Sequence, residues 1–287
     1  MYDVIIIGAG PAGITAGLYT QRGNLKTLII HNGETSLEKA NKIENYYGFE
    51  NGITGKELYF QGIKQAQNIG IDVKKEEVIK IEIEEKHFKV KTNKNEYSSK
   101  TIVIAMGTKK KTLQINGIKK FEGRGISYCA ICDGFFYRNK DVAVIGNGDY
   151  AISEVNDLLS VVNKITILTN GKPAPDIRSE KVEINNRTIK EIFGHEKVEK
   201  IEFDDGTDIN VNVIFIAQGT ADSIDIAKKI GLVLENNKIK VNENMETNIK
   251  GIFACGDCIG GILQISKAVN DGMKAGLNVI KYLNSYK

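Results

Sequence analysis

The four cysteines of this 287-residue chain form two pairs with the same spacing, Cys129-x-x-Cys132 and Cys255-x-x-Cys258. Two thiols three residues apart can close a small-loop disulfide, and the start of a helix beside them lowers the pKa of a thiol. Asp133, directly after the second cysteine, can give or take a proton during thiol–disulfide exchange. The first pair is therefore a candidate redox centre, with two inert cysteines on an aromatic-rich turn as the alternative.

A zinc site is another use of four cysteines, and the spacing disfavours it. A zinc ribbon joins its two cysteine pairs by a linker of about 15–20 residues, whereas nearly half of this chain separates Cys132 from Cys255. The histidines, His31, His87 and His195, are scattered and add no ligand beside either pair. We therefore expect no metal ion.

A glycine-rich loop, Gly8-Ala-Gly10-Pro-Ala-Gly13, stands between an apolar strand expected at 2–7 and a helix expected at 11–20. Gly8 permits the turn, Gly10 lets the backbone approach a pyrophosphate, and Gly13 lets the helix pack closely against the strand. Free amides at the start of the helix then hold the negative charge. The loop predicts a dinucleotide-binding unit.

The end of the next strand, expected at 26–30, departs from this pattern. An acidic residue is expected there to bind the adenosine ribose, but the sequence has His31, and Glu34 is the candidate substitute. We still expect the first unit to bind a dinucleotide.

The same pattern restarts in the middle of the chain. A strand is expected at 141–145, followed by Gly146-Asn-Gly148-Asp-Tyr-Ala151, a helix at 153–162 and a strand at 164–169. The sequence thus predicts an α/β protein with two Rossmann-like dinucleotide-binding domains.

The second domain is expected to be inserted in the first. The last helix, expected at 265–283, most economically completes the first unit, so we predict one domain from 1–112 with 245–287 and an inserted domain at 113–244. Within the first domain, 78–97 alternates apolar and charged residues, as in an antiparallel meander with one exposed face.

Several further motifs accompany the first glycine loop and the inserted unit: Cys129-Ala-Ile-Cys132-Asp133 followed by Gly134-Phe135-Phe136, the late Gly256-Asp257 and the segment Glu44-Asn45-Tyr46. Together they resemble the low-molecular-weight thioredoxin reductases along nearly the whole chain. The resemblance implies a homodimer in which the first domain binds FAD. It also implies the FAD-binding residues, which are Gly8, Gly10, Gly13, Asn45, Asp257 and Gln264.

The resemblance implies the chemistry of the cysteines as well. Asp257 would hold the ribityl chain of the flavin, and Cys129 and Cys132 would form a redox-active disulfide beside the isoalloxazine. Cys132 would face the flavin, Cys129 would attack the disulfide of thioredoxin or a thioredoxin-like protein, and Asp133 would manage the thiol proton. The second cysteine pair, which brackets Asp257, is either a pair of small buried residues packed near the cofactor or a second redox pair.

The segment after the second strand of the inserted unit departs from the NADPH-using members of that family. Those members carry a His-Arg-Arg run and a further arginine to grip the 2′-phosphate, whereas this chain reads Leu168-Thr169-Asn170-Gly171-Lys172-Pro173-Ala174-Pro175. No carboxylate stands there for an NADH ribose, and Tyr150 is large enough to crowd a pyrophosphate. The pattern resembles the ferredoxin-dependent flavin thioredoxin reductases, which implies reduced ferredoxin as the electron donor.

Two alternatives stay open. The nearer is a thioredoxin reductase that uses NADPH or NADH, and the other is a flavin-bearing redox sensor that does not turn over, which Cys129, Cys132 and Asp133 together disfavour. Lysines at 109–111 and 119–120 are candidate contacts for an acidic electron carrier, with solvated surface lysines as the plainer interpretation.

The composition limits the class of protein further. With 41% hydrophobic and 26% charged residues, the chain is typical of a globular protein rather than a disordered one. A net charge of +3 and a pI near 8.4 are too mild to indicate a nucleic-acid partner. No apolar run approaches the ~18 residues of a membrane span, and the N-terminus lacks the basic segment of a signal peptide. We expect a cytoplasmic protein without membrane or nucleic-acid partners.

Overall fold

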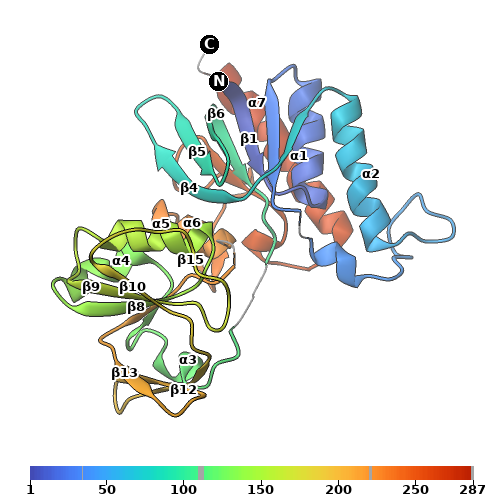
Figure 1. The fold of residues 1–287 in the computed structure, drawn as a ribbon. Coiled ribbons are helices and arrows are strands. Elements are labelled where there is room, and N and C mark those ends of the chain that lie inside the picture. The colour runs from blue at the N-terminus through green and yellow to red at the C-terminus, as the bar shows by residue number, and fades with distance from the viewer. Residues whose placement is uncertain (34, 109–112, 220–221, 286–287) are drawn as a thin grey trace. The chain divides into compact units, whose positions relative to one another are not determined.

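The computed structural model describes residues 1–287 with the exception of 34, 109–112, 220–221 and 286–287. The chain divides into two compact units, Met1–Lys109 with Asp222–Lys287 and Lys110–Ala221. Each unit contains a mainly parallel β-sheet with helices beside it (Figure 1). The α/β class predicted from the two strand–loop–helix patterns is confirmed.

The first unit is built on a sheet whose central strand is β1. Its parallel strands are β1 (Tyr2–Ile7), β2 (Thr27–His31), β3 (Asp72–Lys75), β6 (Glu96–Ile104) and β17 (Ile252–Ala254). The apolar residues at the centre of β1 and β2 are almost fully buried, as expected of parallel strands that are covered on both faces. Because β1, β6 and β17 run in one direction, their carboxyl ends meet at one edge of the sheet.

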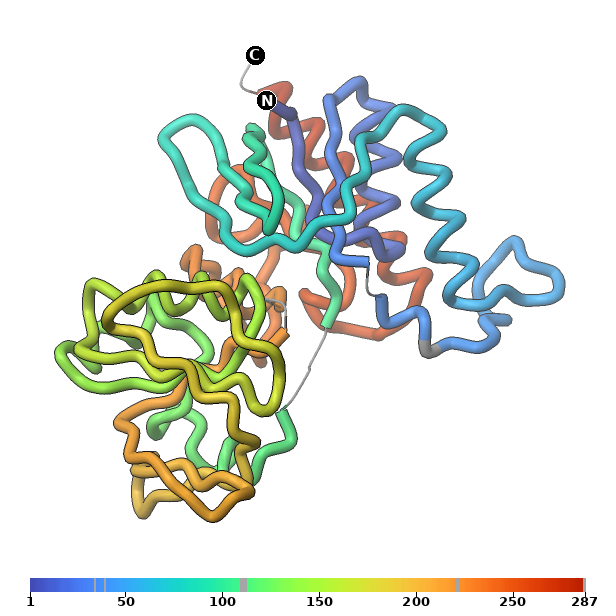
Figure 2. The backbone as a smooth tube through the Cα atoms, viewed as in Figure 1, coloured from blue at the N-terminus to red at the C-terminus, as the bar shows by residue number. Residues whose placement is uncertain are grey.

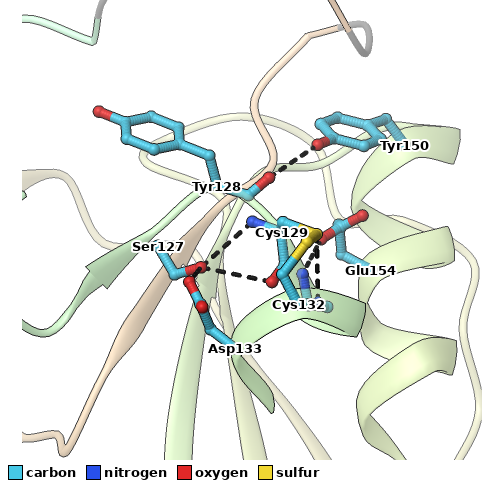
Figure 3. Close-up of a disulfide and its surroundings, with 8 residues drawn as sticks. Ser127, Tyr128, Cys129, Cys132, Asp133, Tyr150 and Glu154 are labelled. Atoms are coloured by element: carbon cyan, nitrogen blue, oxygen red, sulfur yellow. Dashed lines mark hydrogen bonds between the residues drawn. A yellow bond between two sulfur atoms is a disulfide. The ribbon is translucent and has the colours of Figure 1, made fainter. Parts of the chain in front are cut away.

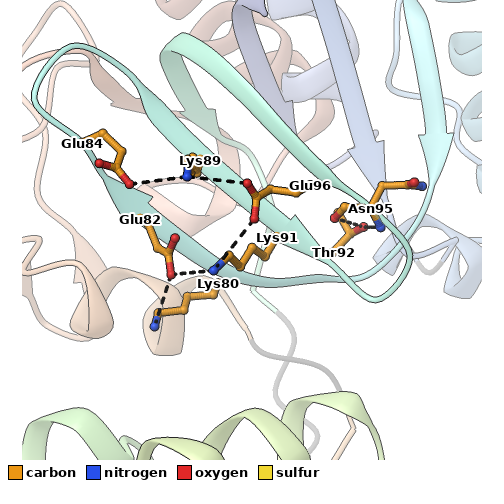
Figure 4. Close-up of polar contacts among 8 residues, drawn as sticks. All are labelled: Lys80, Glu82, Glu84, Lys89, Lys91, Thr92, Asn95 and Glu96. Carbon is orange, nitrogen blue, oxygen red and sulfur yellow. Dashed lines mark hydrogen bonds and ion pairs between the residues drawn. The ribbon is translucent and has the colours of Figure 1, made fainter.

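An antiparallel extension continues this sheet beyond β6. Strands β4 (Val78–Ile83) and β5 (Phe88–Thr92) pair in sequence order with β6. Phe88 and Val90 are buried, and the opposite side carries a ladder of ion pairs among Lys80, Glu82, Glu84, Lys89, Lys91 and Glu96 (Figure 4). The predicted meander is confirmed. The ion pairs lie on a solvated face of the sheet. Exposed pairs of this kind contribute about 0–1 kcal/mol each to the free energy of unfolding.

The main helices of the first unit are α1 (Pro11–Arg22), α2 (Gly55–Asn68) and α7 (Ile265–Asn284). Figure 2 shows α1 in blue and α7 in red lying side by side. A Cβ at Gly272 would overlap the carbonyl of Ala12, and one at Gly276 would meet Ala16, so the two helix backbones approach closely. The last helix thus belongs to the first unit, as its sequence position predicted. No helix within the described ranges is long and apolar enough to cross a membrane.

The second unit has its own parallel sheet in the order β10-β9-β8-β14-β7. Its strands are β7 (Ile126–Ser127), β8 (Asp141–Ile145), β9 (Lys164–Leu168), β10 (Val182–Asn185) and β14 (Ile214–Ile216), and a small antiparallel sheet comprises β11 (Ile189–Phe193), β12 (Lys200–Phe203) and β13 (Asp208–Asn210). Its helical segments are α3 (Ile118–Phe121), α4 (Ala130–Asp133), η2 (Gly134–Tyr137) and α5 (Asp149–Leu158). Helix α5 begins four residues before the predicted start at 153, because the glycine loop leads directly into it from Gly148.

The return of the chain to the first unit differs from the predicted boundary at 245. The first unit resumes at Asp222, so it also contains α6 (Ser223–Lys229), β15 (Leu234–Glu235) and β16 (Lys238–Ile239). The reason is packing: Lys238 Nζ donates to the carbonyl of Asp257 (3.4 Å), and Met245 joins the buried core of the first unit.

Candidate functional site

The first glycine loop has the geometry of a pyrophosphate cradle. Gly8 has a φ of +114°, and a Cβ there would overlap the carbonyl of Ala105. A Cβ at Gly13 would overlap the carbonyl of Gly8, so helix α1 lies directly on the loop. At Gly10, by contrast, a Cβ would meet no atom within 4 Å. The backbone at Gly10 is therefore not covered by neighbouring atoms, which the predicted approach of a pyrophosphate at this residue requires.

The start of α1 favours negative charge beside the glycine loop. Gly10 is the N-cap, no side chain caps the helix, and its first turn contains no acidic residue. The amides of the first turn thus point toward the open face of the loop, where they favour an anion. The cradle fits the pyrophosphate of a dinucleotide.

Two other predicted cofactor residues contact each other, and a third lies directly after β17. Asn45 Nδ2 donates to Oε1 of Gln264 (3.0 Å), which joins two segments from opposite ends of the chain. Asp257 lies in the short helix η3 (Gly256–Ile259), directly after β17. A Cβ at Gly256 would come within 2.8 Å of the Ala12 side chain, so this turn lies against the start of α1.

His31 occupies the strand end where an acid was expected. The Gly33 amide donates to His31 Nδ1 (3.1 Å), and the Tyr59 hydroxyl lies 2.8 Å from the same nitrogen. Burial lowers the pKa of His31, and the nearby charge of Lys75 lowers it further. Both causes favour the neutral imidazole. The proposed substitute, Glu34, lies outside the described residues.

Cys129 and Cys132 are joined by a disulfide, as the resemblance implied (Figure 3). Cys129 is the N-cap of α4, and its Sγ accepts a hydrogen bond from the amide of Cys132 (3.2 Å). Cys129 is buried, whereas Cys132 is exposed. A reductant therefore meets Cys132 first, and Cys129 would have to become accessible before it could attack a bulky disulfide.

Asp133 is held within the same turn. The Ser127 hydroxyl donates to Asp133 Oδ2 (2.7 Å) and accepts a hydrogen bond from the Cys129 amide (3.1 Å). The Asp133 amide donates to the carbonyl of Cys129 (3.1 Å). The carboxylate is thus fixed beside the cysteine pair, where it can serve as a proton acceptor or donor.

Sequence reasoning missed Glu154, which α5 places beside the disulfide (Figure 3). Its side chain is 1% exposed, and Oε2 accepts a hydrogen bond from the Ala130 amide (2.7 Å) at the start of α4. One signal could have found it: Glu154 lies four residues after Tyr150 and four before Leu158, on the apolar face of α5. An acid on that face is buried and needs a partner.

The second cysteine pair has the environment of unreactive thiols. Cys255 and Cys258 are fully buried and unbonded to each other. Burial raises the pKa of Cys258 to about 12 and that of Cys255 well above its usual value. Cys258 Sγ donates to the carbonyls of Cys255 (3.2 Å) and Ile104 (3.4 Å). Because the thiolate is the reactive form of cysteine, thiols with raised pKa values are unreactive. Cys255 and Cys258 therefore act as small buried residues in the core.

The second glycine loop is tied to the segment that follows β9. Asn147 Nδ2 donates to the carbonyl of Pro173 (3.3 Å). Asn170, two residues after β9, accepts a hydrogen bond from the Ile189 amide through Oδ1 (2.8 Å). The side chain at the position that would recognise a nucleotide ribose is therefore hydrogen-bonded to a backbone amide of the chain itself. Tyr150 is buried, and its hydroxyl lies 3.4 Å from the carbonyl of Tyr128.

The candidate lysines divide between described and undescribed parts of the chain. Lys119 and Lys120 lie in α3, where Lys120 Nζ donates to the carbonyl of Gly194 (3.4 Å) and stands over the ring of Phe121. The lysines at 109–111 lie outside the described residues. Over the part of the chain that the structure describes, no three His, Cys, Asp or Glu side chains gather as a metal site.

The sequence is similar to those of known proteins. The family described as pyridine nucleotide-disulphide oxidoreductase matches residues 2–272. The chain is 36% identical to the thioredoxin reductase of Ureaplasma parvum, with 99% of this chain and 97% of that protein covered. It is also 36% identical to the thioredoxin reductase of Bacillus subtilis, with 99% and 95% covered.

Two solved structures are similar along their whole length. The atypical thioredoxin reductase TRi from Desulfovibrio vulgaris Hildenborough has a TM-score of 0.90 and 33% identity, with 99% of each chain covered. A ferredoxin-flavin thioredoxin reductase from Clostridium acetobutylicum has a TM-score of 0.71 and 33% identity, with 99% of this chain and 98% of that chain covered. These matches agree with the predicted architecture of two Rossmann-like domains.

Proposed function

Because the chain belongs to the family of pyridine nucleotide-disulphide oxidoreductases, we propose that it reduces the disulfide of thioredoxin or of a thioredoxin-like protein. The chain is a flavoprotein disulfide oxidoreductase of the thioredoxin reductase type, and FAD is its cofactor. One observation carries the proposal: the Cys129–Cys132 pair is closed as a disulfide at the start of α4, with Cys132 exposed and the Asp133 carboxylate fixed beside it.

The FAD-binding residues are assigned from the first unit. Gly8, Gly10 and Gly13 would hold the pyrophosphate, because the open backbone at Gly10 and the uncapped start of α1 suit it. Asn45, Asp257 and Gln264 would bind the rest of the cofactor, and the contact between Asn45 and Gln264 supports that grouping. FAD, when bound, would supply the two electrons that reduce the Cys129–Cys132 disulfide, and a flavin can collect them one at a time.

The cysteines then carry the electrons to the partner. Two electrons and two protons convert the disulfide into the thiols of Cys129 and Cys132. The Cys129 thiolate attacks one sulfur of the thioredoxin disulfide, which forms a mixed disulfide and releases the other thioredoxin sulfur as a thiolate that takes up a proton. The Cys132 thiolate next attacks Cys129, which closes the internal disulfide and releases the second thioredoxin thiol. Asp133 accepts and returns the thiol proton.

We propose reduced ferredoxin as the electron donor. The support is the segment after β9, where Asn170 bonds the backbone of Ile189 and Pro173 bonds Asn147 of the glycine loop. Recognition of the 2′-phosphate of NADPH would use an arginine fork there, and residues 168–175 contain no arginine. The similar ferredoxin-flavin thioredoxin reductase of Clostridium acetobutylicum is consistent with this donor. The family name favours the alternative, a pyridine nucleotide.

Anaerobic stopped-flow reduction of the bound flavin tests the donor. We expect fast bleaching by reduced ferredoxin, weakening as salt rises, and slow or undetectable bleaching by NADPH and NADH. Rapid, complete bleaching at micromolar NADPH or NADH would establish the nicotinamide-dependent enzyme instead. If the reduced flavin reduces no thioredoxin, the chain is a redox sensor and the proposed activity is wrong.

We also propose a homodimer, on the sequence resemblance alone, and a cytoplasmic location, as expected from the sequence. Light scattering of the purified protein gives the oligomeric state directly, and a monomer at micromolar concentration would contradict the proposal. Fractionation of cells that express the chain tests its location.

A further inference from the structure

A partly buried ion pair on α7 holds the turn that carries Asp257. Lys267 Nζ and Asp271 Oδ2 lie 2.7 Å apart at an (i, i+4) spacing, and their side chains are 23% and 7% exposed. Both residues lie within the first two turns of α7, after its N-cap residue Gln264. The pair therefore lies on the helix that begins after Gln264, and it contacts the turn that carries Asp257; both of these residues are assigned to FAD.

Lys267 binds two carbonyls of that turn. Its Nζ donates to the carbonyl of Gly256 (3.0 Å) and to that of Gly260 (2.5 Å). An ammonium group has three donors, and these carbonyls together with the Asp271 carboxylate use all of them. Gly256 and Gly260 stand on either side of Asp257 and both have positive φ, 79° and 82°. Lys267 thus fixes both ends of the reversal in which Asp257 lies.

Asp271 accepts a hydrogen bond from a backbone amide of the same turn. The amide of Gly256 lies 3.3 Å from Asp271 Oδ2, and Asp271 is buried. A buried carboxylate is costly unless a cation compensates it, so Lys267 and Asp271 depend on each other. Both the N–H and the C=O of Gly256 are held from α7.

We propose that the Lys267–Asp271 pair is a positioning device for the cofactor. It keeps the turn from Gly256 to Gly260 in the conformation in which Asp257 binds FAD, and it acts through the backbone of that turn. The proposal rests on the assignment of Asp257 to FAD, and it is independent of the electron donor and of thioredoxin.

The test is the rate of FAD release from the purified holoenzyme, followed by the rise of flavin fluorescence after dilution. The double variant Lys267→Met with Asp271→Asn removes both charges, so it leaves no unpaired buried ion. Because hydrogen bonds to charged groups are lost, we expect release to be about tenfold faster or more. Lys267→Met alone leaves Asp271 uncompensated and is expected to release FAD faster still. Lys274→Met is the matched control, since Lys274 is exposed on the same helix, and it should release FAD at the wild-type rate.

A purely structural role for the pair predicts a different result. In that case, the double variant would lower the unfolding temperature of the FAD-free protein but leave the FAD release rate and the visible circular dichroism of the flavin unchanged. That outcome would overturn the proposal. Because no reductase assay enters the measurement, a chain that fails to reduce thioredoxin can still pass this test, and an active reductase can fail it.

Discussion

Each of the two units carries a glycine loop at the start of a helix and a Cys-x-x-Cys pair, but the surroundings of these motifs differ between the units. In the first unit the loop is open at Gly10, and the cysteines are buried and unbonded. In the second unit a hydrogen bond from Asn147 to Pro173 ties the loop, and the cysteines form a disulfide with Cys132 exposed. The same residue spacing therefore has a different use in each place.

The environment of the sulfur atoms explains the contrast between the cysteine pairs. Cys129 caps a helix and accepts the amide of Cys132, an arrangement that stabilises negative charge on sulfur. Cys258 instead donates to two carbonyls, an arrangement that requires the protonated thiol. Spacing alone makes a disulfide feasible, and the surrounding dipoles decide whether a thiolate is favoured.

Loss of either cysteine of the disulfide in the second unit should have the largest effect on thioredoxin turnover. Cys129→Ser and Cys132→Ser are each expected to reduce thioredoxin turnover to background, because one remaining thiol cannot complete the exchange. Cys132→Ser should also accumulate a mixed disulfide with thioredoxin through Cys129, measured by non-reducing electrophoresis and mass spectrometry. Trapping through Cys132 in the Cys129→Ser variant would reverse the assigned roles.

A side chain in the open loop should have the next largest effect. Gly10 has an extended backbone (φ −72°, ψ 179°) and free space around its Cβ position, so Gly10→Val is expected to fold but to block the pyrophosphate. The purified variant should be colourless, with a far-ultraviolet circular dichroism spectrum like that of the wild type. Gly13→Val is the contrasting variant, since its side chain would overlap the carbonyl of Gly8 and should prevent folding. A Gly10→Val protein with one FAD per chain would contradict the assignment of the loop.

Replacement of the unreactive cysteines should have the smallest effect. The double variant Cys255→Ala with Cys258→Ala is expected to keep most of the thioredoxin turnover and to lose about 1 kcal/mol of stability per site through lost packing. Near-total loss of turnover with FAD retained would make these cysteines a second redox pair.

The same variant tests the pKa of the buried thiols. A group whose pKa is raised by folding stabilises the protein below its unfolded pKa, and this contribution is lost as the pH rises toward the folded value. For Cys258 the usual value is 9.0 and the folded value about 12. Wild-type stability should therefore fall more steeply than that of the variant between these two pH values, measured by denaturant unfolding. Parallel pH profiles would show that the thiols do not titrate differently in the folded chain.

Short-range patterns predicted most of the fold and the cradle. Gly8 makes the predicted turn and Gly13 the predicted close approach of helix and strand, because both are set by local backbone geometry. The sequence missed Glu154 because its role depends on the Ala130 amide, which only the tertiary fold brings near. It also placed the return to the first unit too late, since the contact between Lys238 and Asp257 is not a periodic signal.

The hydrogen bond from Ile189 to Asn170 has a consequence for the evolution of electron-donor preference in this chain. An arginine at position 170 would add a cation for a nucleotide phosphate, but it would also remove the acceptor of the Ile189 amide. Because this hydrogen bond is partly buried, loss of the acceptor costs stability, so a first substitution toward nicotinamide recognition would be unfavourable before any binding is gained. Acquisition of nicotinamide recognition at this position would thus be coupled to the stability of the second unit. A change of donor would require compensating substitutions around β11 before, or together with, the new charged side chains.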